Sequence, residues 1–330
     1  MSAEQQPQQE FKSLIARKYN VEIDGEIQRK IACWNIANAA RDESNNPLLD
    51  RISLIINQLK EAKPDLFVAL EAGRMSRGIS WTTMALMIQN ETGLEYIGIY
   101  RVNASFGKMG DQESLMGFGK AVFVNPKTMM INNTYQHWMT SSNTIKQASK
   151  PYNKFGSDVV QINCNPVVDG KAIHDIEYKL GFVHFPIERP ARFKAASWLS
   201  EYLDNANVWM GDFNTFPDDG GPEMLRHIIL RNPEYSELVG YYDVTKTFSA
   251  FEHDIVCVPK SRKEIILKTS PESIIVKEDD ENIHVRFASV LDRILCKTSS
   301  RKFSYESNVY PLTDASDHCY METIISKQMI

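Results

Sequence analysis

The chain lacks several features that would place it in a familiar class of protein. None of its 330 residues belongs to an apolar run approaching the ~18–20 residues of a membrane-spanning helix. The first ten residues are polar and lack the apolar stretch of a signal peptide. We therefore expect no membrane span and a location in the cytoplasm or another reducing intracellular compartment.

The chain also has few cysteines and only a small net charge. The five cysteines are widely separated and include no Cys-x-x-Cys pair, which argues against a disulfide framework and a zinc site. The formal net charge of −5 argues against a protein that coats nucleic acid by bulk electrostatics, but it leaves room for a local basic patch and an anionic substrate. A hydrophobic content of 43% permits a full core.

Strand and helix patterns alternate in both halves of the chain. Residues 1–29 form a polar, Gln-rich tail and a lead-in segment. A β-α-β-α-β order follows over 30–100, and a strand–helix–strand order returns over 180–210. Between them, 102–179 is rich in β-branched residues and turn signals, which favours antiparallel strands. No linker divides the chain, so we predict one domain over 30–330 built on two sheets packed face to face.

A stretch late in the chain stands apart from this scheme. Residues 252–288 alternate charged and β-branched residues, include the apolar run 265–267, and carry an acidic turn at 278–281. We interpret the stretch as a β-rich insertion in the form of an extended hairpin. A regulatory or partner-binding insertion is the alternative.

The most informative stretch reads Gly211-Asp212-Phe213-Asn214 and directly follows an apolar run. Because side chains alternate along a strand, Asp212 and Asn214 are expected on one side and Phe213 on the buried side. Gly211 leaves room for close approach of the backbone. A carboxylate can deprotonate a nucleophile, and a neutral amide can hold an oxygen without repelling an anion. This combination suits hydrolysis of a phosphate ester.

Other predicted strands also adjoin polar side chains that apolar packing does not require. These are Asn35 after Trp34, Glu71 after Leu70, His184 after Val183, Asp292 after Leu291, and Asp317 with His318 before the last apolar alternation. One such residue is usually a solvated strand end or a cap, whereas the whole set is harder to dismiss. Oxygen ligands favour Mg²⁺, with Mn²⁺ as a substitute, over zinc. The set predicts metal-assisted attack of water on phosphorus without a covalent nucleophile.

In their order along the chain, these motifs resemble those of the endonuclease/exonuclease/phosphatase superfamily, whose members are similar to DNase I. The matching elements are Cys33-Trp34-Asn35, Leu70-Glu71-Ala72, Val183-His184-Phe185-Pro186, Gly211-Asp212-Phe213-Asn214, Leu291-Asp292 and Ser316-Asp317-His318. No single motif is decisive, and the family's order over about 30–326 carries the resemblance. It implies an α/β fold class: a four-layer α/β/β/α sandwich of two mixed β-sheets flanked by helices.

The resemblance also implies a metal site. Glu71 would bind the metal with help from Asn35 and Asp317. The chain departs from the family at Ala37, where some nucleases carry an acidic residue, and at Arg293, where an aromatic residue is common. The first departure implies a metal site of lower charge.

The catalytic roles follow from the same resemblance. Asp212 would orient or deprotonate water, and Asn214 would hold the scissile phosphate. Asp292 would fix the tautomer of His318 so that its other nitrogen faces the phosphate. His184 would be a second phosphate contact or a general acid.

Three residues outside the motifs are candidates for substrate binding. Arg192 lies in the predicted helix after His184, and a salt bridge on the helix surface is its ordinary alternative. Phe248 and Phe251 match a Thr-aromatic-x-x-Phe segment that borders the substrate cleft in many relatives. Aromatic core packing is the alternative for both.

We interpret the chain as a Mg²⁺-dependent nuclease with nucleic acid, DNA or RNA, as its substrate partner; its oligomeric state stays open. Gly-Asp-Phe-Asn followed by Thr-Phe-Pro at 215–217 is more similar to the nucleases and deadenylases than to the lipid phosphatases, which often carry Leu at the third position. Two alternatives remain. One is a phosphatase or phosphodiesterase acting on phosphoinositides or other small phosphorylated molecules. The other is a catalytically silent binding scaffold, which the complete set of acidic and His positions disfavours.

Overall fold

The computed structural model describes most of the chain. The described residues are 15–19, 26–36, 49–72, 81–101, 105–109, 112–116, 119–138, 158–186, 189–214, 232–239, 250–269, 273–289, 291–298, 303–310 and 313–328. Among these residues, no helix is long and apolar enough to span a membrane.

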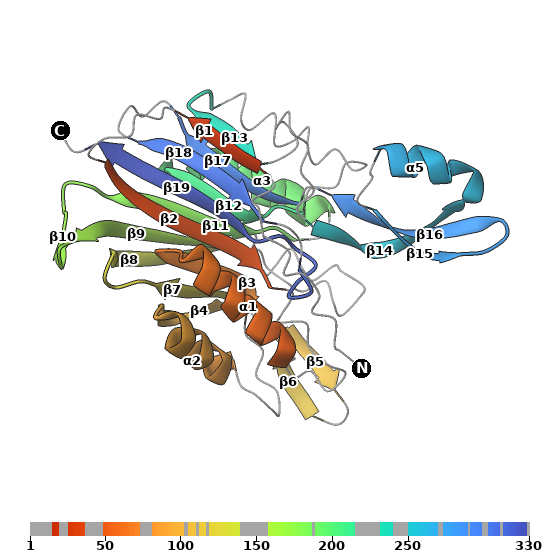
Figure 1. Cartoon of the computed structure of the whole chain (residues 1–330), viewed down its shortest axis with the longest axis horizontal. Helices are drawn as coiled ribbons and strands as arrows, with labels where there is room; N and C mark the ends of the chain where they lie inside the picture. Colours follow the sequence, from red (N-terminus) through yellow and green to blue (C-terminus); the bar gives the residue numbers. More distant parts are fainter. Residues whose placement is uncertain are drawn as a thin grey trace, which may run out of the picture.

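Two large mixed β-sheets form the centre of the molecule (Figure 1). The strands of the first are β1 (Ile15–Tyr19), β2 (Glu26–Asn35), β3 (Leu66–Ala72), β4 (Glu95–Arg101), β7 (Gly119–Val124), β18 (Ser304–Val309) and β19 (Met321–Gln328). Their order is β1-β18-β19-β2-β3-β7-β4, with β2 and β3 parallel and their outer neighbours antiparallel. β1 lies in the segment expected as a lead-in, so the folded chain begins before residue 30 and adds an edge strand to the sheet.

The second sheet has the same mixed character. Its strands are β8 (Met129–Trp138), β9 (Asp158–Val168), β10 (Lys171–Ala172), β11 (Tyr178–His184), β12 (Val208–Asp212), β13 (Tyr235–Val239) and β17 (Asp292–Lys297). They follow the order β10-β9-β11-β12-β17-β13, with β8 beside β9. β11 and β12 are parallel, while β8, β9 and β10 pair antiparallel, which confirms the expectation for the middle of the chain.

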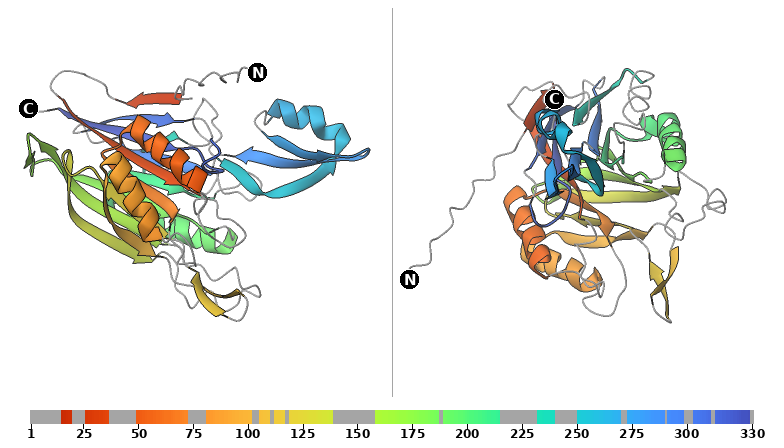
Figure 2. Two further views of the ribbon diagram at one scale, coloured as in Figure 1. Left: turned by 60° about the horizontal axis from the view of Figure 1, so that its bottom comes forward. Right: turned by 90° about the vertical axis from the view of Figure 1, so that its right-hand side faces the viewer.

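Helices cover the outer faces of both sheets. They are α1 (Leu49–Ala62), α2 (Trp81–Thr92) and α3 (Arg189–Tyr202), which the short 3₁₀ turn η4 (Leu203–Asn205) follows. Along β12, Val208 and Met210 face the core between the sheets, whereas Trp209 faces α3. α1 and α2 pack on the first sheet and α3 on the second, on opposite sides of the molecule (Figure 2). The four-layer α/β/β/α sandwich expected from the sequence is confirmed.

Two smaller units extend from the sandwich. One is the hairpin of β5 (Ser105–Met109) and β6 (Gln112–Met116). The other, which we name the arm, comprises residues 250–289: β14 (Ala250–Pro259), the 3₁₀ turn η6 (Lys260–Arg262), α5 (Lys263–Thr269), β15 (Ile274–Glu278) and β16 (Asn282–Ser289). It projects from one end of the sheets (Figures 1 and 2).

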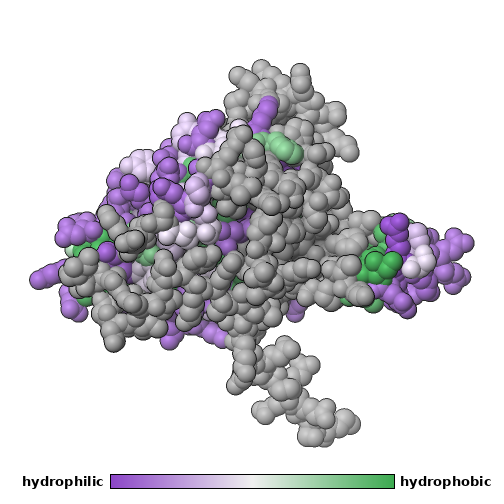
Figure 3. All heavy atoms as spheres, turned by 90° about the horizontal axis from the view of Figure 1, so that it is seen from above, coloured by the Kyte–Doolittle hydropathy of each residue, from purple (hydrophilic) through white to green (hydrophobic). Residues whose placement is uncertain are grey.

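The arm differs from the hairpin expected there. Its sheet has three strands in the order β14-β16-β15, and the run 265–267, read as strand from its β-branched residues, lies in α5. Ile266 packs on Ile283 and Val285 of β16, so tertiary contact overrides the β-propensity of the run. Ile265, 62% exposed, points outward with other apolar residues, and the arm carries a hydrophobic surface patch (Figure 3).

Candidate active site

Three site residues lie side by side across the second sheet. The pairing of β11 with β12 sets His184 opposite Asp212, and the pairing of β12 with β17 sets Asp212 opposite Asp292. Residues in register on neighbouring strands point to one face at a spacing of about 4.8 Å. His184 Nε2 accordingly lies 3.7 Å from Asp212 Oδ2. The sheet therefore aligns one imidazole and two carboxylates in a row.

Asn35 and Glu71 reach the same place from the first sheet. β2 and β3 run parallel, so their carboxyl ends adjoin. The Asn35 Nδ2 amide donates to Glu71 Oε1 at 3.1 Å and to Asp212 Oδ2 at 3.2 Å. His184 Nε2 lies 3.6 Å from Glu71 Oε1. One amide thus connects carboxylates from the two sheets, and the predicted residues of both halves meet.

The backbone at Glu71 departs from regular strand geometry. Its φ is 56°, and the pairing of β3 with β7 is interrupted by a bulge between Ala69 and Ala72. A bulge redirects a side chain, and a positive φ at a residue other than glycine costs about 1–3 kcal/mol, which the surrounding fold must supply. The strain is consistent with a functional position.

The glycine and the phenylalanine of the Gly-Asp-Phe-Asn stretch have the packing roles expected of them. Gly211 has a φ of 142°, and a Cβ there would lie 2.0 Å from the carbonyl oxygen of Val183 on β11. Phe213 is fully buried and packs against Phe185 with ring centroids 4.9 Å apart. These contacts hold β12 close to β11 and fix the direction of Asp212.

Asn214 lies in a tight loop fixed from two sides. Its backbone N–H donates to Asp212 Oδ1 at 2.8 Å, and its side-chain Nδ2 donates to the Phe185 carbonyl at 2.7 Å. Arg192 of α3, only 2% exposed, donates from Nη1 to the Asn214 carbonyl. Arg192 is therefore a buried residue behind the loop, and the helix-surface alternative for it does not apply.

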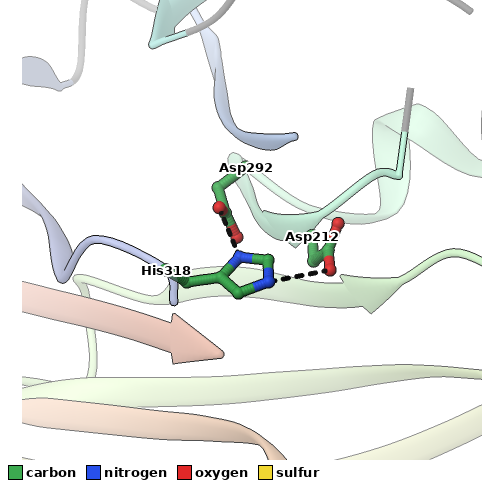
Figure 4. Close-up of side chains that lie close together, drawn as sticks. All are labelled: Asp212, Asp292 and His318. Carbon is green, nitrogen blue, oxygen red and sulfur yellow. Dashed lines mark hydrogen bonds and ion pairs between the residues drawn. The ribbon is translucent and has the colours of Figure 1, made fainter. Parts of the chain in front are cut away.

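His318 forms the expected pair with Asp292. Its Nδ1 lies 2.8 Å from Asp292 Oδ2, and its Nε2 faces Asp212 Oδ2 at 3.8 Å (Figure 4). Burial by itself lowers the pKa of His318, but the charge and hydrogen bond of Asp292, together with the charges of Asp212 and Asp317, outweigh it and raise that pKa to about 10. The imidazole is therefore a cation at neutral pH, with both nitrogens acting as donors.

The segment that carries His318 is attached to the end of β2. Trp34 Nε1 donates to the His318 carbonyl at 2.8 Å. Ser316 Oγ donates to the Asn35 carbonyl at 2.6 Å and accepts from the His318 N–H at 3.1 Å. The half-buried Asp317 lies between these two anchored residues, directly after the serine that bonds to Asn35.

Asp212 lies at the centre of the cluster and is 2% exposed. Burial raises its pKa to about 7, an effect that Asp292 and Glu71 reinforce and that His318 and the Asn214 N–H oppose. A carboxylate with a pKa near neutrality is suited to accept a proton from water at neutral pH.

Two groups of residues could hold a divalent ion. Among the described residues, the group of His, Cys, Asp or Glu whose ligand atoms all lie within 4.8 Å of one another is Asp212, Asp292 and His318. It fits a metal poorly, because the bond between His318 Nδ1 and Asp292 Oδ2 already occupies one ligand atom of each residue.

The predicted ligands Asn35, Glu71 and Asp317 fit a hard ion better. They offer carboxylate and amide oxygens, the donors that Mg²⁺ takes. The Glu71 side chain is 18% exposed, so it is more open to solvent than the buried Asp292–His318 pair.

The aromatic substrate candidates are placed only in part. Phe248 lies outside the described residues. Phe251 belongs to β14 at the root of the arm, where it pairs with Ala288 of β16. Because β16 ends at Ser289 and β17 begins at Asp292, the root of the arm adjoins the cluster along the chain.

Sequence reasoning missed two buried charges. Arg293 is fully buried and forms an ion pair with Glu237, on the face of β17 opposite to Asp292. This contact accounts for the departure from the family pattern at Arg293. Lys120 in β7 is 1% exposed. Its sequence signal is its position directly before the apolar run Ala-Val-Phe-Val.

Comparison with known proteins shows the fold but no sequence match. Neither a family model nor a curated protein matches the chain. An endonuclease/exonuclease/phosphatase family protein from Bacteroides thetaiotaomicron superposes with a TM-score of 0.56 and 14% identity over 92% of this chain and 99% of that one.

Two further structures are named for the molecules bound to them. TDP2 from D. rerio, complexed with single strand DNA product, gives a TM-score of 0.54 and 9% identity over 90% of this chain and 98% of that one. ANGEL2, a 2′,3′-cyclic phosphatase in complex with adenosine-2′,3′-vanadate, gives 0.54 and 11% over 95% and 99%. At such identities the likeness establishes the shared fold.

Proposed function

We propose that this chain, which has the fold of the endonuclease/exonuclease/phosphatase proteins, is a metal-dependent phosphoesterase that hydrolyses phosphodiester bonds of DNA or RNA. The observation that carries the proposal is the Asn35 amide, which joins Glu71 to Asp212 beside the His318–Asp292 pair. A fold alone does not imply an activity, whereas a buried carboxylate 3.8 Å from an imidazole that a second carboxylate orients supports one.

Asp212 is the residue we assign to the attacking water. The Asn214 N–H holds one of its oxygens and the Asn35 amide holds the other, so its direction is fixed before substrate arrives. Its raised pKa suits a base that takes a proton from water near neutral pH. Attack on phosphorus then needs no covalent enzyme intermediate.

The two histidines are assigned to the phosphate. His318 would donate from Nε2 to a phosphoryl oxygen, while Asp292 keeps its imidazole protonated and oriented. His184 is 19% exposed and would bind a second oxygen or protonate the leaving group. Preorganised donors of this kind stabilise the charge that develops in the transition state.

Glu71, Asn35 and Asp317 are the residues that would hold the divalent ion, Mg²⁺ or Mn²⁺. When bound, the ion supplies polarisation of a phosphoryl oxygen and neutralisation of the leaving oxyanion. Asn35 contributes in a second way, because its Nδ2 keeps the Glu71 and Asp212 carboxylates apart at a fixed spacing.

Nucleic acid is the substrate class we favour. Two of the structurally similar proteins are TDP2 with single strand DNA product and ANGEL2 with adenosine-2′,3′-vanadate. We assign Arg192 to the positioning of Asn214, and Phe248 and Phe251 to contacts with the substrate near the root of the arm. Arg192 acts through the Asn214 carbonyl.

The test is a hydrolysis panel with Mg²⁺ or Mn²⁺ and with EDTA. The substrates are single-stranded, duplex and abasic DNA, RNA with a poly(A) tail, and phosphoinositides. We expect metal-dependent cleavage of an oligonucleotide. In Asp212→Ala the rate should fall by about 10³-fold. Asp175→Ala, a change of the same type at an exposed aspartate, serves as the control and should retain full activity.

Two results would redirect the assignment. Intact oligonucleotides beside rapid release of phosphate from phosphoinositides would identify a small-molecule or lipid phosphatase. A folded, metal-supplied protein that hydrolyses none of the substrates would identify a binding scaffold.

A further inference from the structure

Lys120 extends into the interior of the sandwich. It is 1% exposed, in a strand whose residues are all buried. Val122 and Val124, two and four residues further along β7, belong to the core between the two sheets. Because side chains alternate along a strand, the Lys120 side chain projects to the same inner face. A lysine is almost never fully buried unless opposite charge accompanies it.

The strand register places Lys120 at the active-site end of β7. Gly119 pairs with Ala72 and Ala121 with Ala69, so Lys120 lies opposite the bulge of β3. That bulge contains Glu71, the residue with the positive φ. The lysine therefore enters the sandwich next to the end of β3, which supplies the predicted metal ligand Glu71.

The buried thiol of Cys33 shows which charges share this region. Burial raises the pKa of Cys33 most; Asp292 and Asp212 raise it further, and Lys120 lowers it. Coulombic effects weaken with distance, so these three charges all lie within reach of one thiol on β2. Together with the burial of Lys120 on the inner face of β7, this supports a position of the lysine in the same interior as Asp212 and Asp292.

Four carboxylates gather at this end of the sandwich: Glu71, Asp212, Asp292 and Asp317. The His318 ring bonds to Asp292 through Nδ1, and its Nε2 lies 3.8 Å from Asp212. A buried lysine that enters the same interior is therefore placed to offset the negative charge of this group.

We infer that Lys120 is a built-in counter-cation of the carboxylate cluster, an inference that rests on the proposed metal-dependent function. It stabilises the clustered carboxylates before an ion binds, and it weakens the attraction of the cluster for that ion. Lys120 does not contact the reacting atoms in this scheme. It is a positioning residue that sets how tightly the site binds its ion.

Replacement of Lys120 by methionine tests the inference, because methionine is unbranched, similar in length and uncharged. The measurements are Mn²⁺ affinity by titration calorimetry at pH 8 and thermal unfolding with and without Mn²⁺. Loss of a nearby positive charge should tighten Mn²⁺ binding about tenfold. It should also lower the Tm of the metal-free protein, with added Mn²⁺ recovering most of the loss.

Two control variants separate charge from packing. Lys127→Met makes the same change at an exposed residue just after β7 and should leave both measurements unchanged. Lys120→Arg keeps the charge and should keep the Mn²⁺ affinity within about twofold of the wild type. If Lys120→Met does not fold, the shorter polar Lys120→Gln replaces it with the same expectations.

The outcomes distinguish this inference from the proposed function. Wild-type protein that binds Mn²⁺, beside a Lys120→Met variant with equal or weaker affinity, would overturn the role of Lys120 and leave the proposed function standing. Wild-type protein that binds no Mn²⁺ would overturn both the metal-dependent function and the inference built on it.

Discussion

The sandwich and the arm use β-strands in opposite ways. In the sandwich, both faces of the central strands are covered, and a charged side chain such as Arg293 is fully buried with a partner. The arm has a core of Ile266, Ile283 and Val285, and its Glu278 pairs with lysines at the surface. Groups that must be held in fixed directions lie in the part of the fold with the most constraints, as the cluster around Asp212 requires.

The largest difference between the sandwich and the arm is expected in how much their ion pairs contribute to the free energy of unfolding. Arg293→Met leaves the buried Glu237 without its partner and should lower the free energy of unfolding by about 3–5 kcal/mol. Glu278→Gln breaks the exposed pairs of the arm with Lys260 and Lys263 and should change stability within error. Urea unfolding of both variants gives the comparison, and equal losses would contradict it.

The next largest effect concerns how closely two strands of the sandwich approach. Gly211→Ala places a Cβ 2.0 Å from the Val183 carbonyl and should destabilise the protein by about 3 kcal/mol. The matched control is Gly93→Ala, since Gly93 also has a positive φ of 75° but has open space around its Cβ position. That variant should lose only about 1 kcal/mol. Similar losses in the two variants would show that β12 can move away from β11.

The expected effect that is smallest per step is the dependence of stability on pH, taken one pH unit at a time. The pKa of His318 is raised from 6.5 to about 10 in the folded protein, so its contribution to stability is fully present below pH 6.5 and lost as pH rises through 10. The slope in metal-free protein is at most about 1.4 kcal/mol per pH unit.

Asp292→Asn removes the main cause of that raised pKa. Urea unfolding between pH 6.5 and 10 should therefore show a smaller loss of stability for the variant than for the wild type. NMR titration of the His318 ring should show its pKa falling in the same variant. A wild-type slope retained in Asp292→Asn would assign the pH dependence to other groups.

The strand-end positions of Asn35, His184 and Asp212 were predictable, because each follows from a local rule. An apolar run that ends in a carboxylate or an amide marks a strand end, and alternation gave the direction of Asp212 and the burial of Phe213. The resemblance ordered these strand ends into one family pattern. The four-layer sandwich followed from that resemblance together with the order of strands and helices.

The contacts that were not predictable depend on partners distant in the sequence. The apolar run after Lys120 indicates a buried strand, but the position of the lysine beside Glu71 depends on the register of β3 with β7. The charge of Arg293 is explained only by Glu237, which β13 brings beside it. In α5, the β-branched residues at 265–267 favour a strand locally, and packing on β16 decides for a helix.

The attachment of the His318 segment to β2 bears on when the protein becomes active. Trp34 and His318 are 284 residues apart, and Ser316 and Asn35 are 281 apart, yet both pairs are hydrogen bonded. During synthesis, a chain that has emerged only as far as β17 holds Asp212 and Asp292 but lacks the imidazole that completes the site. The proposed hydrolysis therefore requires the segment that carries His318, and its onset would report that β19 has paired with β2.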